Sequence, residues 1–147
     1  MTPPPHGPAD LRRLLTEARA VVAAFDELVS IAGNDRDRSW AQRMGRSAHE
    51  TWDWLLDAAR AADARKFISL VRDVIGIAVP LDDAPEGLWD PSREVTHRLD
   101  VLAGDYQRTF WPMLMPPDNH YPPGVLAEIS AALHQVAAEF DDQRPTA

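Results

Sequence analysis

Apolar residues recur with a helical period along most of the chain, and the clearest such segment comes first. From Leu11 to Ala32, apolar side chains return every three or four residues. This spacing places them on one side of an α-helix. Gly33 and Asn34 follow, and both residue types tolerate the left-handed backbone conformation in which helices often end. The pattern predicts an amphipathic helix over 11–32.

A second helix is predicted to begin near Ser39. The four residues 39–42 (SWAQ) fit a capping box, in which the serine and glutamine side chains satisfy free backbone N–H groups. Its predicted core face comprises Ala41, Met44, Ala48, Trp52, Leu55, Ala59 and Ala62. A neighbouring face carries Trp40, Ser47, Thr51 and Trp54. We therefore expect this helix either to contact two partners or to leave a tryptophan partly exposed.

The third predicted helix is the most apolar. Asp63 can cap its N-terminus. The apolar side chains that then cover most of its circumference are Phe67, Ile68, Leu70, Val71, Val74, Ile75 and Ile77. We expect it to be the central and most buried helix of the fold. A strand over 74–79 is the alternative, although Gly76 weakens it. Pro80 is predicted to end the segment.

Two further helices are predicted, each after a long connection. Asp90 and Pro91 favour a helix start, as the N-cap and the first helical residue. Gly104 is expected to bend or break this fourth helix, and Pro112 to end it. The fifth helix is predicted from an apolar face that comprises Val125, Leu126, Ile129, Leu133, Val136 and Phe140.

These segments predict an all-α protein, a single compact bundle of four to five helices. Two long loops interrupt it, an acidic one over 79–90 and a Pro-rich one over 112–124. The bundle domain is placed at 9–142. A Pro-rich tail over 1–8, expected to be disordered, precedes it, and a polar tail over 143–147 follows it.

Charge is distributed unevenly along the 147 residues, whose net charge is −8. Residues 1–80 carry eleven basic and eleven acidic side chains, whereas residues 81–147 carry four and twelve. Such asymmetry suits binding to a protein partner or an oriented self-association. The alternative is that the acidic residues serve only to keep the protein soluble. The acidic total disfavours a general nucleic-acid or anionic-membrane binder, which would need a basic surface.

The composition also excludes several chemistries. The chain has no cysteine, which rules out disulfides, thiol catalysis, iron–sulfur clusters and cysteine-bound zinc. No apolar run approaches the roughly 20 residues that span a bilayer, and the first residues lack the pattern of a signal peptide. We therefore expect a cytoplasmic protein without a cofactor. Lys66 is the only lysine and alanine is abundant, a bias typical of a GC-rich bacterial genome.

Candidate partner-binding residues are tryptophans and arginines. Five tryptophans are many for this length, and tryptophan is enriched at binding hot spots. The candidates near the second helix are Arg36, Arg38, Trp40, Arg43 and Trp54. Those in or beside the loops are Trp89, Met113, Met115 and Tyr121. Arginines at a helix start oppose the helix dipole, so they favour an acidic partner or an anionic ligand unless nearby aspartates neutralise them.

Two His/Asp pairs suggest a metal site or a general base. His49 and Asp53 are four residues apart on the second helix, and His97 and Asp100 are three apart on the fourth. If the pairs faced each other across the bundle, they could share a metal ion. The Glu-x-x-His motif of helical di-metal proteins occurs only once, at Glu94 and His97, whereas those proteins carry it on two helices together with further glutamates. Exposed polar faces with local pairing are the simpler interpretation.

The sequence contains no Ser/His/Asp arrangement, P-loop or glycine-rich dinucleotide turn. The leading hypothesis is therefore a non-enzymatic adaptor, regulatory or accessory protein that binds a protein partner, a second copy of itself, or both. The alternative is a small helical enzyme or a ligand- or metal-binding bundle that uses the His/Asp pairs. A third hypothesis is a DNA-binding regulator whose basic segment 36–46 contacts the duplex.

Overall fold

A computed structural model of the chain describes residues 7–110, 121 and 123–141. The first helix, α1 (Pro8–Ile31), begins inside the segment expected to be a tail. Proline is tolerated there because the first helical residues need no backbone N–H partner. The backbone N–H of Gly7 donates to the Asp10 carboxylate over 3.3 Å, which fixes the start of the helix. The remaining tail residues, 1–6 and 143–147, lie outside the described residues.

Helix α2 (Asp35–Arg60) begins one turn earlier than predicted. Its N-cap is Asn34, whose side-chain oxygen accepts from the Asp37 backbone N–H over 2.8 Å. The Asn34 amide also donates to the Asp37 carboxylate over 3.1 Å. The capping box expected at Ser39 is therefore wrong, because Ser39 already lies within the helix. Asp35 and Asp37 in the first turn suit the positive end of the helix dipole.

The predicted cap of the third helix is confirmed, but the end of that helix is not. In α3 (Ala64–Gly76), the Asp63 carboxylate accepts from the Lys66 backbone N–H over 3.2 Å. Pro80 does not end the segment. It lies within a separate short helix, α4 (Ala78–Leu81), at a position where the missing N–H costs no helical hydrogen bond.

The expected acidic loop is largely helical. It contains α4 and a 3₁₀ turn, η1 (Glu86–Leu88), which runs directly into α5 (Trp89–Phe110). The fourth predicted helix thus starts before Asp90, and Pro91 lies in its first turn. Gly104 does not break α5, because a single glycine costs only about 1 kcal/mol and the flanking residues pack against the bundle. The last helix is α6 (Pro123–Asp141).

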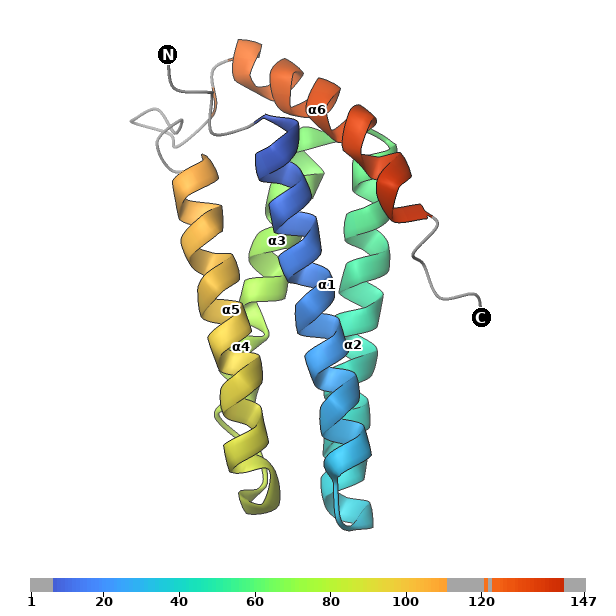
Figure 1. The fold of residues 1–147 in the computed structure, drawn as a ribbon, viewed down its shortest axis with the longest axis vertical. Helices are drawn as coiled ribbons and strands as arrows, with labels where there is room; N and C mark the ends of the chain where they lie inside the picture. The colour runs from blue at the N-terminus through green and yellow to red at the C-terminus, as the bar shows by residue number, and fades with distance from the viewer. Residues whose placement is uncertain (1–6, 111–120, 122, 142–147) are drawn as a thin grey trace.

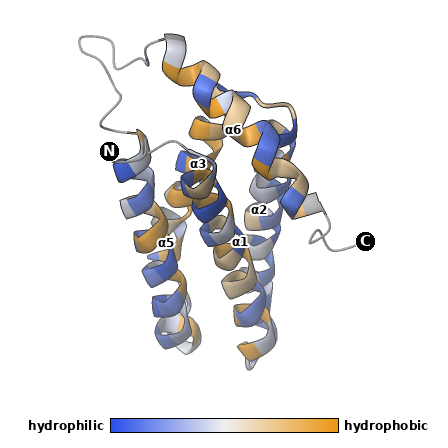
Figure 2. Cartoon of the chain, turned by 45° about the horizontal axis from the view of Figure 1, so that its top comes forward, coloured by the Kyte–Doolittle hydropathy of each residue, from blue (hydrophilic) through white to orange (hydrophobic). Residues whose placement is uncertain are grey.

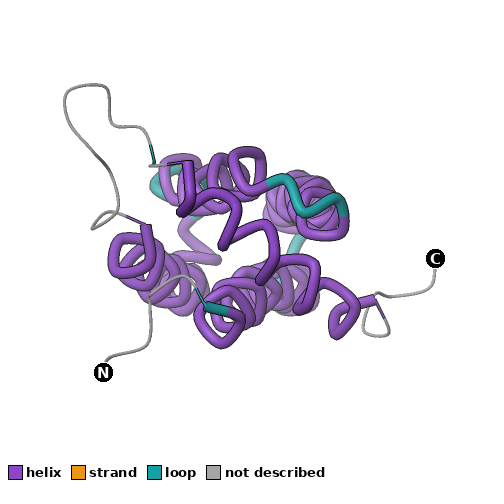
Figure 3. The backbone as a smooth tube through the Cα atoms, turned by 90° about the horizontal axis from the view of Figure 1, so that it is seen from above, coloured by secondary structure: helices purple, strands orange, loops and turns teal. Residues whose placement is uncertain are grey.

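The protein is an all-α bundle. Helices α1, α2, α3 and α5 run alternately in opposite directions along the long axis (Figure 1). Neighbouring pairs in this ring are α1/α2, α2/α3, α3/α5 and α5/α1. Helix α6 crosses one end of the ring, over α1, α2 and α3, as the view from above shows (Figure 3). This arrangement places α2 and α5 diagonally opposite each other.

A continuous apolar core fills the ring, and α1, α2, α3, α5 and α6 each present both apolar and polar residues (Figure 2). The largest fully buried side chains are Phe25, Phe67, Phe110, Leu11, Leu14, Leu15, Leu28, Leu55, Leu56, Leu88, Leu99 and Leu102. The expectation that the third helix is the central one is wrong. Helix α3 exposes Arg65, Lys66, Arg72 and Asp73 to solvent. It is an amphipathic wall of the ring like its neighbours.

Aromatic contacts fasten α6 to the end of the bundle. Phe140 is buried and packs edge-to-face on Trp52 of α2, with ring centroids 6.2 Å apart. The Arg19 guanidinium of α1 lies over the same ring, 5.4 Å from its centroid. Nearby, Arg12 and Glu139 form an ion pair at 3.0 Å. One phenylalanine therefore joins the last helix to the first two.

Candidate functional site

One face of α2 carries several of the predicted partner-binding residues. Arg36 and Arg43 are seven residues apart and exposed, and Trp54 follows eleven residues after Arg43. Seven residues make nearly two turns, so these three side chains lie along one stripe of the helix. Trp54 is 50% exposed although it is a large aromatic residue. The stripe therefore offers an aromatic and cationic surface on a rigid helix.

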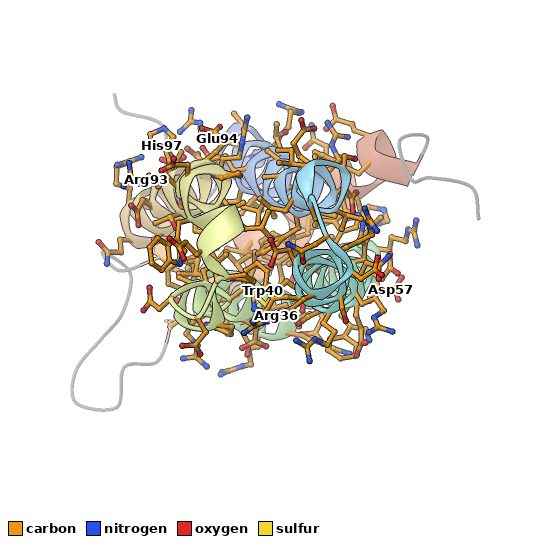
Figure 4. The ribbon with its side chains drawn as sticks, turned by 90° about the horizontal axis from the view of Figure 1, so that it is seen from below. Arg36, Trp40, Asp57, Arg93, Glu94 and His97 are labelled. Carbon is orange, nitrogen blue, oxygen red and sulfur yellow. The ribbon has the colours of Figure 1, made fainter. Side chains whose placement is uncertain are left out.

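Trp40 belongs to the edge of the same stripe. It is half-buried and packs against the apolar core. Figure 4 shows Trp40 and Arg36 on the side of α2 that borders α3. Because the core holds part of the Trp40 ring, its remaining surface is presented in a fixed position. This is the arrangement of an aromatic anchor that loses little conformational entropy on binding.

Three other members of this stripe are absent from the predicted partner-binding residues, although Ser47 is predicted on the same face as Trp40 and Trp54. The full set alternates in steps of four and three residues: Arg36, Trp40, Arg43, Ser47, Glu50, Trp54 and Asp57. We call it the α2 seam. In the sequence, these residues recur in steps of four and three, as the core residues of the helix do, but they lie a quarter-turn or more away from the core face. Glu50 and Asp57 are exposed, and Asp57 pairs with Arg60 at 3.2 Å.

Arg38, by contrast, has a local role. Its guanidinium pairs with Asp35 at 3.1 Å and donates to the Ala32 carbonyl over 3.3 Å. It thus closes the connection between α1 and α2 and does not join the seam. Arg36, Arg38 and Arg43 therefore do not form one cationic cluster. Asp35 neutralises the charge of Arg38 locally, as the sequence allows for arginines beside aspartates.

The loop candidates do not form one surface. Trp89 is 57% exposed at the start of α5, where its indole N–H donates to the Ala84 carbonyl over 2.7 Å. Tyr121 lies at the opposite end, packed edge-to-face on Phe110 with centroids 6.5 Å apart. Burial raises the pKa of Tyr121 to about 12, with a smaller contribution from Tyr106. Tyr121 is thus largely a packing residue. Met113 and Met115 lie outside the described residues.

The two His/Asp pairs are not brought together. His49 Nε2 lies 2.8 Å from Asp26 Oδ1, so its partner is on α1 and is not Asp53. His97 and Asp100 are exposed on α5, the helix diagonal to α2. Figure 4 shows His97 on the outer side of α5, beside Glu94 and away from α2. Within the described ranges, no three His, Asp or Glu side chains gather as metal ligands would.

A groove of about 500 Å³ between α1 and α5 is lined by none of the candidate partner-binding or metal-binding residues. Its lining comprises Ala20, Ala23, Ala24, Glu27, Leu28, Ile31, Pro91, Glu94, Val95 and Arg98. Glu94 and Arg98 pair with each other at 3.1 Å along its edge. The groove is therefore mostly apolar, and two of its charges are already neutralised.

A partly buried polar cluster lies elsewhere between α1 and α5. Asp105 is buried and forms an ion pair with Arg108. Burial raises the pKa of Glu17, and the charges of Arg13 and Arg108 partly oppose this. One Glu17 carboxylate oxygen has no hydrogen-bond partner among the described residues. The ionised form of Glu17 is therefore less favourable in the folded protein than in the unfolded chain.

Glu17→Gln is expected to raise the free energy of unfolding near neutral pH and to change it little in acid. As pH rises past the ordinary pKa of 4.5, the unfolded chain ionises first. Stability is then lost until pH exceeds the raised pKa of the folded protein. Glutamine carries no such penalty. Urea unfolding in acid and near pH 7 measures the difference, with Glu27→Gln at an exposed site on α1 as the control. An equal effect at both pH values would contradict the burial argument.

Comparison with known proteins adds no further constraint. The chain matches no family model, no curated protein and no solved structure among those compared. In the part of the chain that the structure describes, no helix is both long and apolar enough to cross a bilayer.

Proposed function

We propose that this protein is a non-enzymatic interaction protein, an adaptor, regulatory or accessory subunit that binds a protein partner through the α2 seam. The observation that carries the proposal is Trp54, half exposed on a helix whose other face is packed into the core. Action in the cytoplasm stays a prediction of the sequence.

The chemistry of the seam supports a protein partner. Tryptophan and arginine are the residues most enriched at interface hot spots, and here Trp54 and Arg43 share one face. Because α2 is long and packed against α1, α3 and α6, the face is held rigid before binding. Less entropy is then lost on association.

The other two hypotheses receive less support. His49 engages Asp26 at an exposed position, so the arrangement proposed for an enzyme or metal site is not what α2 presents. A DNA-binding role would use Arg36 and Arg43, but Glu50 and Asp57 continue the same stripe. Their carboxylates would repel the phosphates of a duplex lying along the helix.

Trp54→Ala is expected to reduce partner binding by about tenfold or more, the loss typical of a hot-spot tryptophan. The measurement is quantitative capture from native lysate by the immobilised protein, with the captured chains identified by mass. Second copies of this chain count among them. Trp89→Ala is the matched control, because Trp89 is similarly exposed but lies outside the seam. Equal capture by both variants and the unmodified protein would overturn the proposal.

A further inference from the structure

The α2 seam has a symmetry that identifies its partner. Read from Arg36 to Asp57, the residue types run Arg, Trp, Arg, Ser, Glu, Trp, Asp. Read backwards, the aromatic positions coincide and each basic residue is replaced by an acidic one. A surface with this pattern is complementary to its own copy, provided that the copy runs in the opposite direction.

We propose that the α2 seam binds the α2 seam of a second copy of this chain, antiparallel, about a two-fold axis that passes beside Ser47. This inference rests on the proposed function, in that it uses the same surface, and it names the partner. The experiments below distinguish a second copy of this chain from an unrelated protein bound at the seam.

The register follows from distances along the helix. Trp40 and Trp54 each lie seven residues from Ser47, so Trp40 of one copy faces Trp54 of the other across the axis. Arg43 and Glu50 lie four and three residues from Ser47 and also meet. At the ends, Arg36 and Asp57 lie eleven and ten residues from it. Every opposite-charge pair therefore occurs twice in the dimer.

The charges also select the direction. In a parallel pair, each seam residue would face its own copy, so Arg36 and Arg43 would meet arginines and Glu50 would meet glutamate. Like charges placed opposite each other are destabilising, whereas the antiparallel pair brings only opposite charges together. The seam thus favours one orientation and disfavours the other.

The shape of the seam suits close packing of two helices. Ser47 at the centre is small and exposed, so the helices can approach most closely at the axis. A seven-residue repeat drifts by about 20° per heptad around a straight helix. Figure 4 agrees, with Arg36 on the α3 side of α2 and Asp57 on the side away from α3. Two such seams wind around each other as in a short left-handed coiled coil.

The size of the contact predicts a reversible dimer. The 22 residues from Arg36 to Asp57 span about 33 Å of helix, and one helix per subunit buries less area than a standard interface. We therefore expect a dissociation constant in the micromolar range or weaker. Because the pairs are exposed, the dimer should weaken as salt is added.

The decisive experiment exchanges charges between two variants of the full chain. Arg43→Glu and Glu50→Arg are each expected to weaken self-association by at least about tenfold, because like charges then meet twice. Mixed in equal amounts, the two variants restore both opposite-charge pairs and should form a heterodimer. Analytical ultracentrifugation reads the result as conversion from 16.4 kDa to twice that mass.

Controls separate this result from a general effect of charge or misfolding. Arg93→Glu makes the same charge change as Arg43→Glu on the exposed outer side of α5 and should leave the dimer intact (Figure 4). Circular dichroism should show unchanged helicity in every variant. A mixture that stays monomeric while the unmodified protein dimerises would overturn the antiparallel register.

A second measurement does not depend on charge. The chain has no cysteine, so Ser47→Cys introduces a single thiol, placed beside the proposed axis. Under mild oxidation this variant should form a covalent dimer, since the two thiols can come within disulfide range. Ser30→Cys, at an exposed serine of α1 outside the seam, is the matched control and should cross-link far less.

The outcomes distinguish this inference from the proposed function. A protein that stays monomeric up to millimolar concentration, with no preferential cross-linking at position 47, would overturn the dimer. If Trp54→Ala then still abolished capture of another protein, the seam would be an interface for that protein and the proposed function would stand. If Trp54→Ala changed nothing either, both proposals would fail.

Discussion

Phe67→Ala is expected to lower the free energy of unfolding by about 3–5 kcal/mol, enough to unfold a marginal domain of this size. Phe67 lies on α3 with no exposed surface and belongs to the continuous core of the ring. Truncation removes its buried apolar area and leaves a cavity that helices held on both sides can only partly close. Urea unfolding followed by circular dichroism measures the loss.

Two controls test the physical reason. Phe67→Leu keeps most of the volume and should cost less than half as much. Trp54→Ala removes a larger aromatic ring from a half-exposed site and should cost under about 1 kcal/mol, because little packing is lost. Comparable losses for Phe67→Ala and Trp54→Ala would contradict the burial of one and the exposure of the other.

Phe140→Ala is expected to release α6 from the end of the bundle, at a cost of about 2–5 kcal/mol. The ring is buried, touches Trp52 edge-to-face and lies under the Arg19 guanidinium. Its loss removes an apolar contact and a cation–π contact together. Hydrogen exchange should show faster exchange in α6, with smaller changes in the middle of α1 and α2.

Glu139→Ala is the neighbouring control. Glu139 pairs with Arg12 across the same two helices, but both side chains are substantially exposed. Such surface pairs contribute only about 0–1 kcal/mol. Exchange in α6 should therefore stay close to that of the unmodified protein. A larger effect from Glu139→Ala than from Phe140→Ala would mean that charge, and not aromatic packing, holds α6 in place.

Periodicity was sufficient to predict the helices but not their ends. The apolar spacing predicts a helix over 11–32, and α1 spans Pro8–Ile31, so its start lies three residues before the predicted one. The start of α2 was misplaced because two capping patterns compete within six residues. Asn34 and Ser39 both fit an N-cap, and only the contact of Asn34 with Asp37 decides between them. Such a choice depends on local geometry that the residue types alone do not contain.

The short elements between α3 and α5 show another limit. Prolines and acidic residues over 79–90 are typical of a loop, yet this segment forms α4 and η1. Leu81 and Leu88 are buried, so the segment packs against the core. A Cβ on Gly87 would stand 2.5 Å from a carboxylate oxygen of Asp37, so η1 approaches α2 closely. Contacts of this kind override the local propensity of the sequence.

Helical spacing predicts which candidate residues share a face of one helix, but not which elements meet. Arg36, Trp40, Arg43 and Trp54 do share a face of α2, as the helical spacing requires. The sequence places Trp89 and Tyr121 together beside the loops, but α5 separates them by its whole length. The sequence spacing pairs His49 with Asp53 along one helix, whereas the structure places His49 against Asp26 across a helix interface. Contacts between elements follow from packing, which one-dimensional spacing does not determine.

The ring of helices also constrains the order of folding. Helices α1 and α2 are joined by three residues, 32–34, so this hairpin can form at a small cost in loop entropy. The contact between α1 and α5 joins segments that end at Ile31 and begin at Trp89. We expect this contact to form after the intervening hairpins, because closing a longer loop costs more conformational entropy before the contact can stabilise the chain. The folding transition state should therefore contain the α1–α2 hairpin, whereas the α1–α5 contact should form after it. Substitutions at the α1–α5 contact should then mainly accelerate unfolding.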